Sequence, residues 1–230
     1  MPVFFIPGDE DPSPVVTLPR TSATPLAPYI TAATEHGAIY LDAPYELTVG
    51  GVSLWLIPES VLDLDIESAA AQYQASMDTL LTREDSPEKN AALQVAAYRL
   101  DVLRRTEEAF AQMKESDTRI VLSHYPISSG TALMMQSWAG GNSVSPYKYV
   151  SLILAGHTCA GQYRLPGVGA LWAPDGSWLP PDSAVTGFST VMGVTQYITP
   201  GLGTCAEYLL PFRFLNSPTV SILTLTSKLQ

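Results

Sequence analysis

The sequence predicts an α/β protein, in the broad sense that includes α+β folds, and two observations support this prediction. Short apolar runs, each typical of a buried strand, end at Gly, Pro or His and span residues 3–6, 119–123 and 149–155. Residues 60–115 instead repeat apolar side chains every three or four positions, as one face of a helix does. Strands and helices therefore share one chain.

Composition narrows the class of protein. The 230 residues are 46% hydrophobic and 15% charged, which is enough apolar material for a folded core. The net charge of −10 argues against a nucleic-acid partner, because such partners need a basic surface. No apolar run reaches the length of a membrane span, and no basic region precedes the first apolar residues as in a signal peptide. We expect one domain over residues 1–230 with no integral membrane segment.

The first sixty residues predict strands around one helix. A strand over residues 3–6 ends at Pro7-Gly8, and the carboxylates Asp9, Glu10 and Asp11 follow it. Gly50-Gly51, flanked by alternating apolar residues, predicts a hairpin. The expected elements of this part are a helix over residues 21–36, ending at Gly37, and strands over residues 38–41, 45–49 and 52–57.

Residues 60–115 predict a helical hairpin inserted into the domain. One amphipathic helix covers the repeat from Ile66 to Leu80, and a second runs to about Glu115. Ser86-Pro87 supplies an N-cap followed by a proline at the first helical position. The basic residues of the second helix are expected to form a solvated face rather than a phosphate site. They are Arg99, Arg104, Arg105 and Lys114.

The C-terminal half predicts further strands separated by glycine-rich turns. Residues 128–145 contain several glycines and are expected to form a flexible loop that could cover a site. Turns are expected at residues 167–169 and 174–176, and strands over residues 196–199 and 219–226. No internal repeat is present.

The residues that could carry chemistry follow the predicted strands. His157 and Cys159 stand two positions apart behind the run at 149–155, and both are potential metal ligands. His124 ends the strand at 119–123, although a lone histidine is more often structural. Asp9 and its two acidic neighbours are either a solvated turn or a cation site, because adjacent carboxylates repel one another.

Several of these stretches resemble motifs of the calcineurin-like metallophosphoesterases. Gly156-His157-Thr-Cys159-Ala-Gly161-Gln162 resembles that family's Gly-His-Thr-His-Gly-Gln motif, with cysteine in place of the second histidine. The subgroup most similar is the bacterial one of lipid-A-precursor pyrophosphatases and Tat-exported phosphoesterases. Its other matching stretches are Arg164-Leu-Pro166, Tyr197-Ile-Thr-Pro-Gly-Leu-Gly203, Pro211-Phe-Arg213-Phe214 and Asn216-Ser-Pro218.

The resemblance implies a β-sandwich flanked by helices with a two-metal site at the strand ends. It assigns Asp9, His124 and His157 to the second metal, and it assigns Cys159 to a first-metal position. Glu10 falls on the family's proton-donating histidine, so the resemblance makes Glu10, His124 and His157 the candidate catalytic residues. The remaining first-metal motifs, Asp-x-His and Gly-Asp, would lie upstream of Met1, so we expect the first βαβ unit to be missing.

The implied cofactor is a divalent metal ion, either Zn, Mn, Fe or Mg. Two imidazoles and a carboxylate suit one zinc ion with an open position for water, so zinc is favoured. Cys159 would close that position and make the site structural. With one metal and a changed acid, we expect weak phosphoesterase activity from this chain alone.

Two functions from different classes follow. In the first, the chain hydrolyses a small phosphoester or pyrophosphate, lipid-linked substrates included; in the second, it is an inactive remnant or a single-metal binding protein with the phosphoesterase fold. A redox role of Cys159 and Cys205 is a minor third alternative. A missing first unit would expose a sheet edge, which predicts either a homo-oligomer or an unusual element that covers this edge. Localisation stays open between cytoplasmic and, given an upstream segment, membrane-peripheral or exported.

Overall fold

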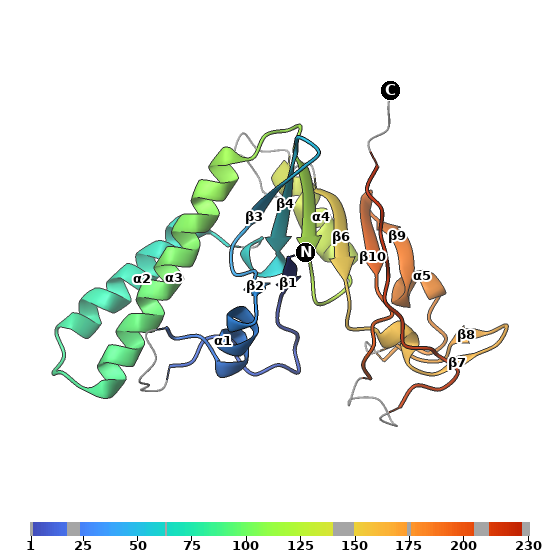
Figure 1. The fold of residues 1–230 in the computed structure, drawn as a ribbon, viewed down its shortest axis with the longest axis horizontal. Helices are drawn as coiled ribbons and strands as arrows, with labels where there is room; N and C mark the ends of the chain where they lie inside the picture. Colours follow the sequence, from blue (N-terminus) through green and yellow to red (C-terminus); the bar gives the residue numbers. More distant parts are fainter. Residues whose placement is uncertain are drawn as a thin grey trace. The chain divides into compact units, whose positions relative to one another are not determined.

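The protein combines helices with a six-stranded mixed sheet. A computed structural model describes residues 2–17, 24–62, 64–139, 150–173, 176–204 and 212–226 (Figure 1). Hydrogen bonding orders six strands as β3-β4-β5-β6-β10-β9, and β1-β2 and β7-β8 form two small sheets. The broad fold class predicted from the sequence is confirmed. The Cα positions cluster into two compact units, Met1–Leu122 with Met135–Ser151, and Ser123–Met134 with Leu152–Gln230.

The first unit begins with a small parallel sheet around a short helix. Strand β1 (Val3–Phe5) pairs with β2 (Ala38–Tyr40), and α1 (Pro28–Glu35) connects them. The prediction of a helix over residues 21–36 was wrong at its start. Pro28 occupies the first helical turn, and prolines disfavour helical conformation in the residue before them, so residues 24–27 stay outside the helix. Residues 21–23 of that prediction lie outside the described residues.

The predicted glycine hairpin is present in the first unit. Strand β3 (Tyr45–Val49) pairs antiparallel with β4 (Val52–Pro58), and β4 pairs parallel with β5 (Thr118–Leu122). Gly50 and Gly51 both have positive φ, 59° and 81°, which the two-residue turn between twisted strands requires. A short 3₁₀ turn, η1 (Glu59–Val61), follows β4.

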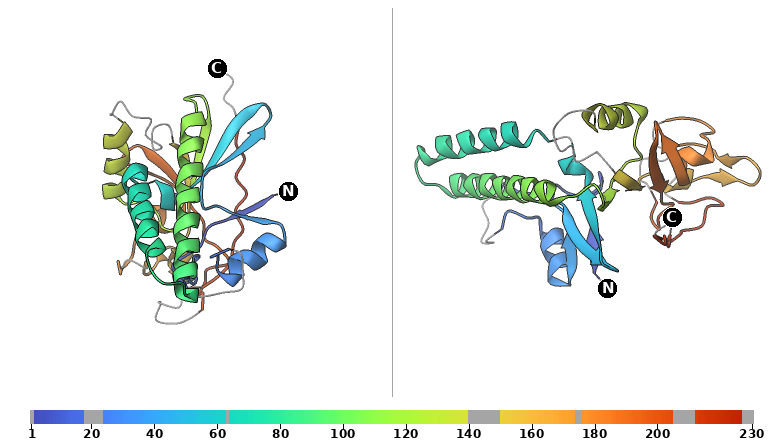
Figure 2. Two further views of the ribbon diagram at one scale, coloured as in Figure 1. Left: turned by 90° about the vertical axis from the view of Figure 1, so that its left-hand side faces the viewer. Right: turned by 90° about the horizontal axis from the view of Figure 1, so that it is seen from above.

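The predicted helical hairpin connects β4 to β5. Helix α2 (Ile66–Leu81) and helix α3 (Pro87–Gln112) pack side by side (Figures 1 and 2). Each N-terminus is capped by a side chain: Asp65 accepts from the amide of Ser68, and Ser86 accepts from the amide of Lys89. Among the described residues, no helix combines the length and the hydropathy that crossing a membrane requires.

Helix α3 is fastened to the loop after β2 by a polar cluster. Both guanidinium Nη atoms of Arg105 donate to the Asp42 carboxylate, at 2.9 and 2.8 Å, and the Tyr98 hydroxyl donates to the same carboxylate at 2.6 Å. Burial and the bond to Asp42 raise the pKa of Tyr98, so this hydroxyl stays a donor over the whole neutral range. These bonds hold α3 against the loop that follows β2.

The second unit is built on three strands. Strand β6 (Val150–Ala155), whose first two residues cluster with the first unit, pairs parallel with β10 (Val194–Ile198), and β10 pairs antiparallel with β9 (Gly187–Val191). Ile153 and Ile198 are fully buried in this sheet. The remaining elements are η2 (Cys159–Gly161), β7 (Arg164–Leu165), β8 (Gly169–Ala170) and α5 (Asp182–Val185).

Two predictions for this half of the chain were wrong. Residues 129–139 form helix α4 (Ser129–Ala139) and not a flexible loop, because Ser128 caps the helix and Ala132 and Met135 are buried; residues 140–145 lie outside the described residues. Residues 219–226 are extended but belong to no strand. Val220 and Ile222 are 72% and 90% exposed, so the β propensity of this stretch is not matched by a ladder partner in the described part of the chain.

Replacing Asp42 with alanine should lower the free energy of unfolding by about 2 kcal/mol, because Arg105 and Tyr98 lose a charged acceptor. Urea denaturation followed by circular dichroism measures the change. Glu108→Ala is the control, since it removes an exposed i,i+4 partner of Arg104 and should cost at most about 0.5 kcal/mol. Equal effects of the two substitutions would contradict this account of the cluster.

Candidate metal centre

Two histidines emerge side by side where neighbouring chain segments leave the sheet of the second unit. The amide of Ser123 donates to the carbonyl of Leu154 at 2.9 Å, and the amide of Gly156 donates to the carbonyl of His124 at 3.1 Å. This backbone pairing continues to the last residue before His157. The register of the two segments therefore brings His124 and His157 together, although they are 33 positions apart in the sequence.

The two imidazoles face each other directly. Nε2 of His124 lies 3.1 Å from Nδ1 of His157, and the ring centroids are 5.0 Å apart at an interplanar angle of 72°. The Tyr125 ring packs against both, with centroid distances of 4.6 Å to His124 and 4.4 Å to His157. Both histidines are half-buried, and the packing of Tyr125 helps to hold their rings.

This pair of nitrogens fits two neighbouring positions around a metal ion. Zinc binds imidazole nitrogen at about 2.0–2.1 Å in tetrahedral geometry, which places two such ligands about 3.3 Å from each other. The observed separation of 3.1 Å is close to that value. A hydrogen bond between the rings would also explain this distance, provided that one of the two facing nitrogens carries a proton.

The acidic turn after β1 belongs to the first unit and is shaped by its own carboxylates. Oδ1 of Asp9 accepts from the amide of Glu10 at 3.0 Å, and Oδ2 of Asp11 accepts from the amide of Gly8 at 2.8 Å. Both side chains thereby satisfy backbone donors that a tight turn leaves unpaired. Asp9 and Glu10 are exposed.

His124 and His157 come together within the second unit, whereas Asp9 belongs to the first unit, so the group of all three around one metal ion stays a prediction. The resemblance to the metallophosphoesterases assigns these three side chains to the second metal. Within the described residues this group does not include Cys159, whose side chain is half-buried in the turn after His157. Cys205 lies outside the described residues, so a disulfide between the two cysteines stays an open alternative.

The turn that carries His157 has an uncommon backbone conformation. His157 has a φ of 64°, and four consecutive residues, 159–162, also have positive φ. Three of those four are not glycine, and such residues cost about 1–3 kcal/mol each unless their surroundings hold them. The Thr158 hydroxyl donates to the carbonyl of Val185 at 2.6 Å, which anchors the turn to α5. Strain of this kind is concentrated at functional sites in proteins.

Sequence reasoning missed several residues that support this turn and the neighbouring loop. Gln196 is buried on β10, where it accepts from the amide of Ile127 at 3.0 Å and donates to Ser189 at 3.1 Å. Arg213 and Asn216 appeared in the family-like ending but received no role, although both bind carbonyls of the turn. The one available signal was an isolated polar residue in an apolar strand, Gln196, which suggests a buried hydrogen-bond partner.

Comparisons with models of known protein families, with curated proteins and with solved structures give no match. The resemblance to calcineurin-like metallophosphoesterases therefore rests on the motifs quoted above.

Gly161→Ala should destabilise the protein strongly. The added Cβ would overlap the Cβ of Ala170 and lie 3.0 Å from the carbonyl oxygen of Trp172, and φ is +73°. Gly167→Ala is a matched control, because its φ is +77° but nothing lies within 4 Å of the added atom. Urea denaturation should show a loss of about 1–2 kcal/mol for the control and about 3 kcal/mol or more for Gly161→Ala. Equal losses would mean that the turn does not pack as described.

Proposed function

We propose that this protein is a metal-dependent hydrolase of phosphoesters or pyrophosphates, with one divalent cation held by Asp9, His124 and His157. The observation that carries the proposal is the pair of facing imidazole nitrogens at the ends of two adjacent segments. Two neutral imidazoles and one carboxylate are a donor set typical of catalytic zinc sites, which keep a fourth position open. Zinc is therefore the favoured ion, and Mn, Fe and Mg are the alternatives.

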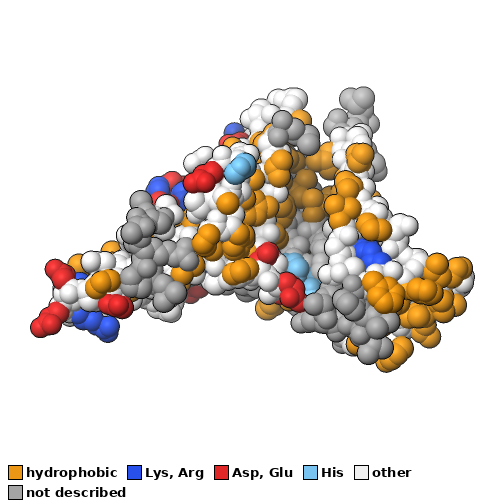
Figure 3. Space-filling model, turned by 60° about the horizontal axis from the view of Figure 1, so that its bottom comes forward, with side chains coloured by type: hydrophobic (Ala, Val, Ile, Leu, Met, Phe, Trp, Pro, Cys, Tyr) orange, Lys and Arg blue, Asp and Glu red, His pale blue; other side chains and the backbone are white. Residues whose placement is uncertain are grey.

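The described part of the second unit, which carries the two histidines, is less acidic than the net charge of −10 suggests. In the described part of the second unit, the Lys, Arg, Asp and Glu residues are Arg164, Asp182 and Arg213. Many of the exposed side chains there are apolar, and Figure 3 shows them gathered around β7 and β8. Two arginines and one aspartate therefore make the described part of the second unit no source of further repulsion for a phosphate, and the carboxylates of the proposed site come from the first unit.

The chain's own residues would divide the reaction as follows. Bound there, a divalent ion would polarise a phosphoryl oxygen and acidify a water molecule. His124 and His157 would fix the ion's position, and Asp9 would lower the charge that the site presents. As the water oxygen bonds to phosphorus and the ester bond breaks, Glu10 would give a proton to the leaving oxygen, and the proton of the attacking water would pass to solvent.

The second candidate is a metal-binding protein without turnover. It is favoured by Cys159, which stands two positions after His157 and carries a soft sulfur ligand. Four protein ligands close a zinc site and exclude the water that hydrolysis needs. Both candidates have the same fold, so only measurements of metal coordination and of hydrolysis can distinguish the hydrolase from the metal-binding protein. The β-sandwich of the phosphoesterase family and the homo-oligomer through a sheet edge remain predictions.

Phosphoester hydrolysis with added Zn²⁺, Mn²⁺ or Mg²⁺ tests the first candidate. The wild-type protein should hydrolyse bis(p-nitrophenyl) phosphate or a pyrophosphate, and the His124→Ala, His157→Ala double variant should lose at least about 100-fold of that rate. His36→Ala is the matched control, because His36 closes helix α1 with its ring bonded to the carbonyl of Ala32 and should leave the rate unchanged. Equal rates in the wild-type protein and the double variant would remove this function.

Cobalt binding tests the role of Cys159. If its thiolate completes the site, the Co²⁺-loaded wild-type protein should show a sulfur-to-cobalt charge-transfer absorption that Cys159→Ser abolishes. If the site is open, the absorption is absent, and Cys159→Ser binds Co²⁺ as the wild type does. The first result supports the closed, non-catalytic site, and the second contradicts it.

A further inference from the structure

We propose that Arg213 and Asn216 are positioning residues that hold the turn after His157 in its metal-binding geometry without touching the metal. The inference rests on the proposed metal site and adds to it a way in which a distant segment, residues 212–218, controls that site. Every residue in the argument belongs to the second unit.

The guanidinium of Arg213 is committed to oxygen atoms of three segments. Nε donates to the carbonyl of Gly203 at 2.8 Å, and Nη2 donates to the carbonyls of Pro200 at 2.6 Å and Gly201 at 3.1 Å. Nη1 donates to Oδ1 of Asn216 at 3.2 Å and, more weakly, to the carbonyl of Cys159 at 3.4 Å. These five bonds match the five N–H donors that a guanidinium offers.

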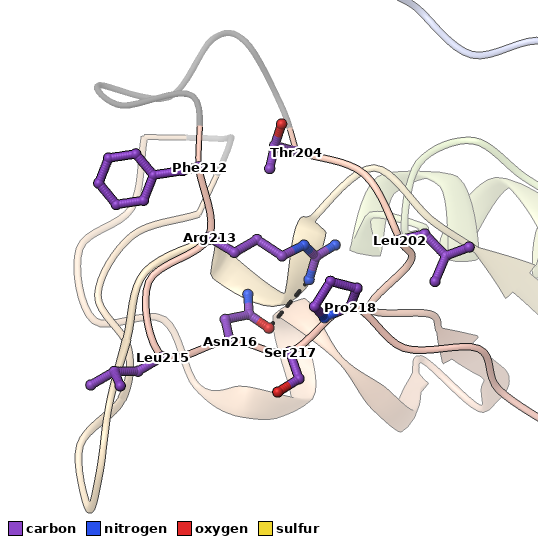
Figure 4. A pocket seen from close by; sticks show the side chains of 8 residues that line it. All are labelled: Leu202, Thr204, Phe212, Arg213, Leu215, Asn216, Ser217 and Pro218. Carbon is purple, nitrogen blue, oxygen red and sulfur yellow. Dashed lines mark hydrogen bonds between the residues drawn. The ribbon is translucent and has the colours of Figure 1, made fainter.

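Arg213 therefore connects three chain segments, and we call its guanidinium group the hub of this hydrogen-bond network. Among the described residues, its acceptors are neutral oxygens, so it works through geometry and not through an ion pair. Figure 4 shows Arg213 and Asn216 pointing toward each other beneath an open pocket, while Phe212 and Leu202 point away from them.

Asn216 and its neighbours hold both ends of the strained turn. Nδ2 of Asn216 donates to the carbonyl of Cys159 at 2.7 Å and to the carbonyl of Gln162 at 3.3 Å. The amide of Phe214 also donates to the carbonyl of Gln162 at 3.1 Å, and the carbonyl of Phe214 accepts from the amide of Arg164 at 3.0 Å. The carbonyls at the two ends of the run of positive φ are thus held from outside the turn.

The hub also ties the turn to the strand beside it. Thr199 follows β10 and precedes Pro200 and Gly201, and its amide donates to the carbonyl of Ala155, the last residue of β6. His157 stands two residues after that carbonyl. Hydrogen bonds therefore link the end of β6 to the residues after β10, link these residues to Arg213, and link Arg213 to Cys159. This closed circuit of bonds encloses His157, which lies in the chain between Ala155 and Cys159. Because positive-φ residues relax unless they are held, opening this circuit should let His157 move.

Three variants and two measurements test the proposal. Arg213→Met removes the hub with little change in length. Asn216→Asp keeps an acceptor for Arg213 but removes both donations to the turn. Arg104→Met is the control, because it deletes an exposed arginine of α3 that has only carboxylate partners on its own helix. Hydrogen–deuterium exchange is measured on the metal-free proteins, and affinity is measured with Zn²⁺ and Co²⁺ as probes.

We expect the amides of residues 157–164 to exchange faster in both test variants than in the wild type. This increase should be larger than any change elsewhere in the second unit. We also expect their Zn²⁺ affinity to fall about 10-fold to 100-fold, the usual effect of losing an outer-sphere support, with an altered Co²⁺ absorption spectrum. Arg104→Met should match the wild type in all three measurements.

Unchanged exchange at residues 157–164 in the two variants, together with wild-type affinity, would overturn the proposal. If Arg213→Met does not fold, Asn216→Asp decides, because it leaves the hub in place. If the wild-type protein binds neither ion, the proposed function fails, and the exchange measurement alone then decides whether these residues hold the turn.

Discussion

The candidate site depends on one backbone constraint, the continued pairing of two segments beyond the ends of their strands. The bonds from Ser123 to Leu154 and from Gly156 to His124 fix the register in which the segments leave the sheet. A shift of one residue would turn each side chain to the opposite face and separate the two imidazoles. The 3.1 Å approach of His124 to His157 is therefore a consequence of sheet register, and the rest of the site adds to it.

Much of this fold was predictable because its local signals agree with its tertiary structure. The glycine pair at 50–51, the capped proline start of α3 and the apolar run of β6 each specify one conformation, and each was found. The histidines could be paired from the sequence because each follows a buried strand, and strand ends are where ligands gather in sheets of this type. Their facing geometry could not be predicted, since it depends on register, which the sequence does not state.

The two wrong predictions in the C-terminal half share a physical cause. Residues 128–145 and 219–226 were interpreted from composition alone, by their glycines in one case and by their β-branched residues in the other. Helix α4 forms because Ser128 caps it and Ala132 packs in a core, whereas residues 219–226 gain no ladder partner in the described structure. Glycine content and β propensity are weak indications, and burial decides between the alternatives they leave. The roles of Gln196, Arg213 and Asn216 escaped notice for the same reason, because their partners are backbone carbonyls and amides far away in the sequence.

Charge balance explains why one sulfur atom separates the two candidate functions. Two imidazoles and one carboxylate would leave a divalent ion with a net charge of about +1, and this charge would attract a phosphate group and help to activate water. A thiolate from Cys159 would cancel that charge as well as fill the last position, so it would weaken both substrate attraction and water activation. The conformation of the turn after His157 therefore bears on whether Cys159 can bind the ion. Its positive φ values and the hydrogen bonds from Asn216 and Arg213 fix the backbone of Cys159, from which the sulfur would have to reach the ion.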